Sequence, residues 1–95
     1  MTTYIVRVQL SNSTPQNYTT LKNALLKAGF SKKIIAKDGS AYILPNGNYL
    51  GESDKPINKI TNIVKVIALQ IDKAPQILVT SQGEQGNSWI GLPRA

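Results

Sequence analysis

Hydrophobic residues recur with a helical spacing in two stretches of the chain and alternate with polar residues around them. The first stripe contains Tyr18, Leu21, Leu25 and Ala28, and the second contains Ile57, Ile60, Val64, Ile67 and Ile71. This i, i+3/4, i+7 spacing puts the side chains of each stripe on one face of a helix. A period-two run over residues 4–10 precedes the first stripe, two apolar runs separate the stripes, and residues 77–80 follow the second.

The order of these elements predicts a single α+β domain over residues 1–95. It is β-α-β-β-α-β, the split βαβ or ferredoxin-like plan, in which an antiparallel sheet carries two helices on one face. Alternation along the first strand divides its side chains between the two faces of the sheet. We expect Tyr4, Val6, Val8 and Leu10 to pack under the helices, and Ile5, Arg7 and Gln9 to line the open face.

Local sequence signals predict the ends of the helices. Thr14 is a good N-cap, Pro15 suits the first helical position, and Gly29 suits the left-handed residue that ends a helix. The second helix is expected to be capped by Ser53 or Asp54, with Pro56 near its first turn. Its many β-branched residues weaken helix propensity, so tertiary burial must stabilise it.

The middle of the chain predicts two strands, over residues 30–37 and 40–44. Asp38 and Gly39 between them indicate a two-residue type I′ hairpin turn. Asn46 and Gly47 mark a further turn, after which residues 49–51 extend the third strand beyond a bulge or form a small flap. The fourth strand is expected over residues 76–81. The apolar tail 88–92 adds a fifth strand, with Trp89 either packed in the core or docked on a partner.

Charge and composition narrow the function. Eleven lysine and arginine residues against five acidic residues give a formal net charge of +6, which favours a polyanionic partner such as RNA, DNA or a membrane surface, the alternative being a solvated surface with spare lysines. The chain has no cysteine and no histidine, which excludes a Ser-His-Asp triad, a Cys-His dyad and a conventional zinc site within one chain. We see no membrane-spanning run and no signal peptide. A cytoplasmic protein without a metal or cofactor is therefore expected.

Two groups of residues are candidates for contact with RNA. Arg7 and Gln9 lie on the predicted open face of the sheet, where ferredoxin-like RNA binders place basic and aromatic residues. The second group is a lysine cluster that would form a phosphate-binding rim: Lys22, Lys27, Lys32, Lys33 and Lys37. The alternatives are a dimer interface for the face and a solvated surface for the lysines. The predicted nucleic-acid-binding residues are Arg7, Gln9, Lys32, Lys33 and Tyr42.

Catalysis is less well defined by the sequence. The carboxylates are Asp38, Glu52, Asp54, Asp72 and Glu84. A two-metal nuclease needs several of them to converge, but a turn already explains Asp38 and a helix cap explains Asp54. A metal-independent ribonuclease would draw on Arg7, Lys32, Lys33, Tyr42 and Tyr49. No catalytic residue is assigned.

Several segments together resemble a family of small bacterial proteins, the GhoS-type antitoxins. The first segment is residues 3–10, and the second contains Tyr18, Leu21, Gly29, Phe30 and Ser31. The third joins Asp38 and Gly39 to residues 42–45, and the fourth joins residues 77–80 to Ser88 and Trp89. The resemblance implies a ferredoxin-like fold similar to the small nuclease subunits of CRISPR adaptation, and an antitoxin that cleaves the messenger of its toxin. Those subunits carry an aspartate at the end of the first strand, where this chain has Ser11 and Asn12.

The charge and the family resemblance together predict an antitoxin-like protein that binds single-stranded RNA. If this protein is an enzyme, the expected activity is that of an endoribonuclease that cleaves a toxin messenger RNA. An uncovered sheet face on so small a domain also predicts a homodimer. The alternative is a non-catalytic protein-interaction module, such as a phage- or plasmid-borne accessory protein.

Overall fold

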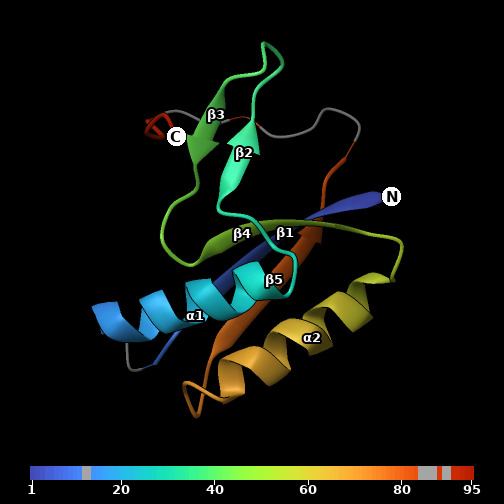
Figure 1. Cartoon of the computed structure of the whole chain (residues 1–95). Helices are drawn as coiled ribbons and strands as arrows, with labels where there is room; N and C mark the ends of the chain where they lie inside the picture. Colours follow the sequence, from blue (N-terminus) through green and yellow to red (C-terminus); the bar gives the residue numbers. More distant parts are fainter. Residues whose placement is uncertain (12–13, 84–87, 89–90) are drawn as a thin grey trace.

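The computed structural model describes residues 1–11, 14–83, 88 and 91–95. The described elements are, in chain order, β1 (Thr2–Gln9), α1 (Pro15–Lys27), β2 (Lys33–Ile35), β3 (Ala41–Ile43), β4 (Asn48–Ser53), α2 (Ile57–Leu69) and β5 (Gln76–Ser81). An antiparallel sheet of order β4-β1-β5 forms the body, and β2 and β3 form a separate antiparallel hairpin. Both helices lie on one side of the sheet (Figure 1). This α+β arrangement confirms the predicted fold.

The core lies between β1 and the two helices, as the alternation along β1 predicts. Tyr4, Val6, Val8 and Leu10 are all buried, whereas Arg7 and Gln9 are exposed on the other face. The helices contribute the matching apolar surface through Leu21, Leu25, Ile60, Val64 and Ala68. Two residues of the predicted stripes lie outside the core: Ala28 after the end of α1 and Ile57 at the start of α2 are both exposed. Neither described helix has the length and hydrophobicity needed to cross a bilayer.

The third strand of the sheet begins later in the chain than predicted. It is β4, not residues 40–44, and it pairs with β1 so that Tyr49 lies opposite Val6. The predicted second strand divides near Lys32: Ser31 exchanges two backbone hydrogen bonds with Leu50, at 2.7 and 2.8 Å, and the chain then leaves the sheet. The packing of Phe30 explains this register. A Cβ at Gly51 would lie 2.7 Å from the Phe30 ring, so glycine lets the ring pack against β4.

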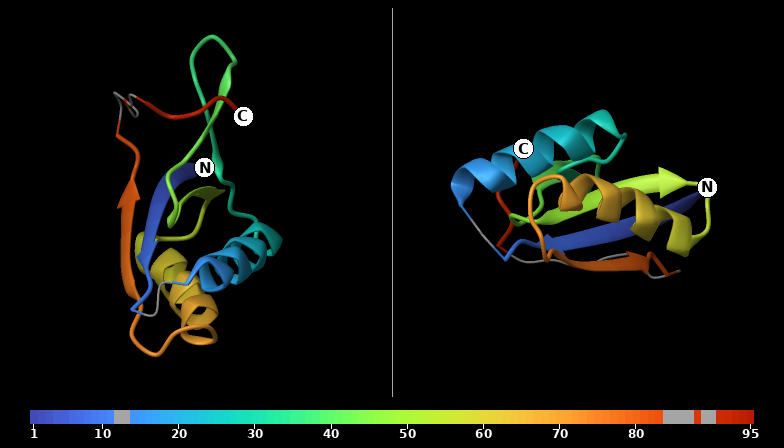
Figure 2. Two further views of the ribbon diagram at one scale, coloured as in Figure 1. Left: turned by 90° about the vertical axis from the view of Figure 1, so that its left-hand side faces the viewer. Right: turned by 90° about the horizontal axis from the view of Figure 1, so that it is seen from below.

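The β2–β3 hairpin projects away from the two helices (Figure 1 and the left view of Figure 2). Its turn is not type I′, because Gly39 has a φ of +89° but neither Asp38 nor any other described non-glycine residue has a positive φ. Instead the Gly39 N–H donates to the Ala36 oxygen and the Ala36 N–H to the Ser40 oxygen, as in a type I turn followed by a glycine bulge. The end of the chain pairs with the hairpin, since the Ile43 N–H donates to Pro93 and the Ala95 N–H to Ala41. The Trp89 prediction lies outside the described residues.

The predicted caps of α1 are confirmed. The Thr14 hydroxyl accepts a hydrogen bond from the Asn17 N–H at 3.1 Å, with Pro15 as the first helical residue. Gly29 has a φ of +100°, and the N–H groups of Gly29 and Phe30 donate to the carbonyls of Leu26 and Leu25. This is the Schellman arrangement, in which a left-handed glycine closes the helix.

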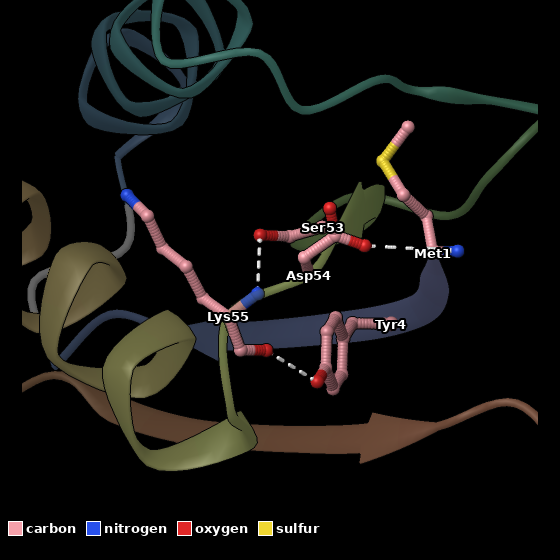
Figure 3. A network of polar contacts seen from close by, with 5 residues as sticks. All are labelled: Met1, Tyr4, Ser53, Asp54 and Lys55. Carbon is pink, nitrogen blue, oxygen red and sulfur yellow. Dashed lines mark hydrogen bonds and ion pairs between the residues drawn. The ribbon is translucent and has the colours of Figure 1, made fainter.

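The predicted cap of α2 is wrong. Pro56 occupies the N-cap position and makes no side-chain hydrogen bond to the helix. The candidate caps act in the preceding loop instead: the Ser53 hydroxyl accepts from the Lys55 N–H at 3.0 Å, and an Asp54 oxygen lies 3.7 Å from the N-terminal amine (Figure 3). The Tyr4 hydroxyl donates to the Lys55 carbonyl at 2.7 Å, which ties this loop to β1.

Candidate nucleic-acid interface

A broad pocket of about 600 Å³ lies between α1 and the turn that leads into β4. Its described lining is mostly polar: Pro15, Tyr18, Thr19, Lys22, Lys32, Asn46, Gly47 and Tyr49. We call this the α1 pocket. The helical spacing of Tyr18 and Lys22, four residues apart, places both on the same side of α1. The pocket therefore combines two lysines with hydroxyl and amide groups.

The turn at residues 45–48 forms one wall of the α1 pocket. The Asn48 N–H donates to the Pro45 carbonyl at 3.0 Å, and Gly47 has a φ of +82°. A positive φ at the third residue alone is typical of a type II turn. The Gly47 carbonyl accepts from the Val8 N–H at 2.7 Å, and a Cβ at Gly47 would lie 2.5 Å from the Val8 oxygen. The turn therefore packs directly against the backbone of β1 at Val8.

Lys32 connects this turn to the pocket. Its ammonium group donates to the Pro45 carbonyl at 2.6 Å and to the Asn48 carbonyl at 3.1 Å. It also lies 4.9 Å from the centre of the Tyr49 ring, within range of a cation–π contact. Burial, and secondarily the charge of Lys22, lower the pKa of Lys32. An anion in the pocket would relieve the repulsion between the two lysines, which favours anion binding.

The tyrosines of the pocket are held by structural contacts. The Tyr18 hydroxyl accepts a hydrogen bond from the Leu10 N–H at 3.0 Å. Burial, and secondarily Tyr18, raise the pKa of Tyr49 to about 12, so the Tyr49 phenol stays protonated near neutral pH. The described lining contains no carboxylate. The arrangement is suited to holding an anion, and the protonated Tyr49 phenol is not available to take a proton from a substrate.

Arg7 and Gln9 lie on the opposite face of the sheet from the α1 pocket. They line a smaller hollow of about 220 Å³ with Gln76, Ile77 and Leu78. Across the strands, Arg7 is opposite Leu78 and Gln9 is opposite Gln76. No described strand residue of this face is aromatic: Tyr49 points into the core, and Tyr42 lies on the hairpin. The basic and aromatic surface that ferredoxin-like RNA binders carry on this face is therefore not reproduced by the described strand residues.

The five predicted RNA-binding residues occupy three separate places. Lys32 lines the α1 pocket, whereas Arg7 and Gln9 lie on the open face. Lys33 is exposed on β2, and the half-buried Tyr42 on β3 has the Arg94 guanidinium 5.4 Å from its ring centre. The final set of five left out Lys22, although the predicted lysine cluster included it, and the structure brings it to the same pocket as Lys32.

The described carboxylates do not form a metal site. Asp72 is buried and accepts hydrogen bonds from the Ser11 N–H at 2.5 Å and the Ser11 hydroxyl at 2.6 Å. The Ser11 hydroxyl is the largest cause of a lowered pKa at Asp72, assisted by backbone N–H groups and opposed by burial. Asp38 accepts from the Ser40 N–H at 2.9 Å, and this bond lowers its pKa. Glu84 lies outside the described residues.

We expect Asp72→Asn to lower the melting temperature at neutral pH. The pKa of Asp72 is lower in the folded than in the unfolded chain, so its stabilisation is present above the unfolded pKa and is lost as pH falls through the folded pKa. The difference between variant and parent should therefore shrink below about pH 4. Asp54→Asn is the control, because this side chain is 86% exposed and should matter little at any pH. Melting curves across pH test this, and a pH-independent difference would contradict it.

No protein-family model matches this chain, and no curated protein sequence matches it either.

Proposed function

We propose that this protein binds single-stranded RNA in an antitoxin-like role, and that the α1 pocket holds a phosphate of the strand. The observation that carries the proposal is the convergence of Lys22 and Lys32 on a pocket with no carboxylate in its described lining. Lysine neutralises phosphate as a point charge, without reading sequence. The proposal places the protein in the cytoplasm, where messenger RNA is found.

The charge distribution supports a polyanionic partner. Among the described residues, no lysine forms a salt bridge with a carboxylate, and the ion pair present joins the N-terminal amine to Asp54. Of the described acidic groups, Asp72 and Asp38 are engaged with Ser11 and Ser40. The described carboxylates therefore do not neutralise the lysine charges, and phosphate contacts made by these lysines would release counterions. The sequence resemblance to RNA-directed antitoxins favours RNA among polyanions.

The other predicted contacts extend this proposal beyond the pocket. Lys33 follows Lys32 directly and begins the hairpin, which also carries Tyr42 with the Arg94 guanidinium against its ring. Arg7 and Gln9 provide a second contact on the open face. Because the open face and the α1 pocket lie on opposite sides of the sheet, a strand would have to pass around the edge of the molecule to use both.

The pocket chemistry favours binding over cleavage. Metal-independent RNA cleavage needs a group that takes the proton of the attacking hydroxyl. Tyr49 stays protonated near neutral pH, and the Lys32 ammonium already donates to two carbonyls. The proposed antitoxin action is therefore retention of the toxin messenger. Endoribonuclease activity is tested in the same experiment, by analysing bound RNA for fragments with and without a chelator.

Lys22→Ala should weaken binding of single-stranded RNA and flatten its salt dependence. Loss of one phosphate contact lowers the slope of log K against log salt by about 0.7. Lys22 is the better test residue, because Lys32→Ala would also remove the two bonds that hold the turn. Lys65→Ala is the matched control, since it removes the same charge from the exposed surface of α2. Fluorescence anisotropy over a salt series measures the effect.

Three outcomes would contradict the pocket assignment. Equal effects of Lys22→Ala and Lys65→Ala would indicate non-specific attraction by net charge. A loss seen only with Arg7→Ala would move the RNA to the open face. Absence of RNA binding by the parent would overturn the proposed function altogether.

The second candidate function is a non-catalytic protein-interaction module. It is favoured by the aliphatic residues of the open face, where Ile5 and Leu50 are half-buried and Leu78 is 57% exposed. Ile5 and Leu50 lie directly opposite each other on β1 and β4. Binding through this surface would depend weakly on salt, whereas RNA binding would depend on it strongly.

A further inference from the structure

β5 forms one edge of the sheet. It pairs with β1 on one side, and in the described part of the chain no strand pairs with its other side. The opposite edge of the sheet is different, because Ser31 bonds to Leu50 on the outer side of β4. An unpaired edge presents a row of backbone donors and acceptors to any strand that can approach.

The sequence of β5 lacks the features that usually protect an edge. Charged side chains, prolines and bulges inside an edge strand discourage pairing with other chains. Residues 74–83 contain no charged residue, and the only proline in this stretch, Pro75, precedes the strand. In a chain with a net charge of +6, this is a place where two copies can approach without bringing lysines together.

The side chains of β5 also leave apolar surface on both faces of the sheet. Leu78 is 57% exposed on the open face. Ile77 and Val79 pack against the core from the helix side and are only partly buried. A neighbouring strand would cover surface on both faces at once, which supplies a hydrophobic contribution in addition to backbone hydrogen bonds.

We propose that two copies of this chain pair through their β5 edges, antiparallel about a two-fold axis. A second copy fits because a two-fold axis brings the same edge of β5 from each copy together, with the two strands antiparallel. The pairing yields one continuous sheet of order β4-β1-β5-β5-β1-β4. Leu78 lines the hollow beside Arg7, so the dimer places both Arg7 hollows on one broad open face. This inference does not depend on RNA binding at the α1 pocket.

Sedimentation equilibrium over a concentration series tests the dimer. The parent should be dimeric, and Leu78→Lys combined with Thr80→Lys should be monomeric, because the four added charges lie close together near the two-fold axis. Both side chains are exposed in the single chain, so the variant should keep the parent's circular dichroism spectrum. Val66→Lys is the control, since this residue is 60% exposed on α2 and its substitution should leave the dimer intact.

Amide hydrogen exchange on the parent locates the interface without a variant. The β5 N–H groups that do not bond to β1 should become more protected as protein concentration rises. A parent that is monomeric at every concentration would overturn the proposal. So would a dimer that survives the double lysine variant, or one in which these β5 amides show no concentration-dependent protection.

Discussion

Val6→Asp should leave the chain unfolded under conditions in which the parent is folded. Val6 is fully buried at the centre of the sheet, between Tyr49 on β4 and Val79 on β5. An unpaired carboxylate there costs several kcal/mol, a large part of the roughly 5–15 kcal/mol that stabilises a typical domain. Circular dichroism and urea titration measure the loss.

Arg7→Asp provides the matched control for Val6→Asp. Arg7 is the next residue along β1 but is exposed on the opposite face of the sheet. Introducing the same side chain there should leave the melting transition close to that of the parent. If Val6→Asp melted like Arg7→Asp, the assignment of the two faces of β1 would be wrong.

Gly47→Ala should cause the second-largest loss, about 2–5 kcal/mol. A non-glycine residue with positive φ costs roughly 1–2 kcal/mol, and overpacking typically adds about 1–3 kcal/mol. Overpacking is expected because the new Cβ would lie 2.5 Å from the Val8 oxygen, and that oxygen belongs to the backbone of the central strand. Because Gly47 also lines the α1 pocket, we expect weaker RNA binding from any Gly47→Ala protein that still folds.

Gly39→Ala separates the two contributions. Gly39 has a similar φ of +89°, but no heavy atom lies within 4 Å of the position that its Cβ would take. It should therefore show only the conformational cost, and urea unfolding should place it clearly between the parent and Gly47→Ala. Equal losses for the two variants would show that the contact with Val8 contributes nothing to the requirement for glycine at position 47.

The tests of RNA binding and of dimerisation are independent of each other. The α1 pocket lies on the helix side of the sheet, whereas β5 lies at the sheet edge away from β4. Lys22→Ala should leave the sedimentation of the protein unchanged, and it should weaken RNA binding by the same factor in the Leu78→Lys, Thr80→Lys background, because Leu78 lines the open-face hollow and not the α1 pocket. A change in both properties with either variant would indicate that RNA bridges the two copies.

The sequence by itself determined the fold class, the two faces of β1 and the caps of α1. These features depend on side chains close together in the chain: the alternation around Val6, the hydroxyl of Thr14 and the left-handed Gly29. Local periodicity is sufficient for them, because each is decided within one turn of helix or a few residues of strand. The start of α2 was not determined, since Ser53 and Asp54 found partners in the preceding loop and at the N-terminus.

Only the tertiary structure decided which segment forms the third strand. Residues 40–44 and 48–53 are both short and plausible as strands, but β4 alone offers Tyr49 to the core and a glycine beside the distant Phe30 ring. The same choice sends residues 33–43 into a hairpin, which separates Lys33 and Tyr42 from Arg7. The pairing of β4 with β1 also packs the turn at Gly47 against β1, so that Lys32 and Lys22 of α1 line the same pocket. Contacts between residues this far apart depend on packing of the whole domain, which no local pattern encodes.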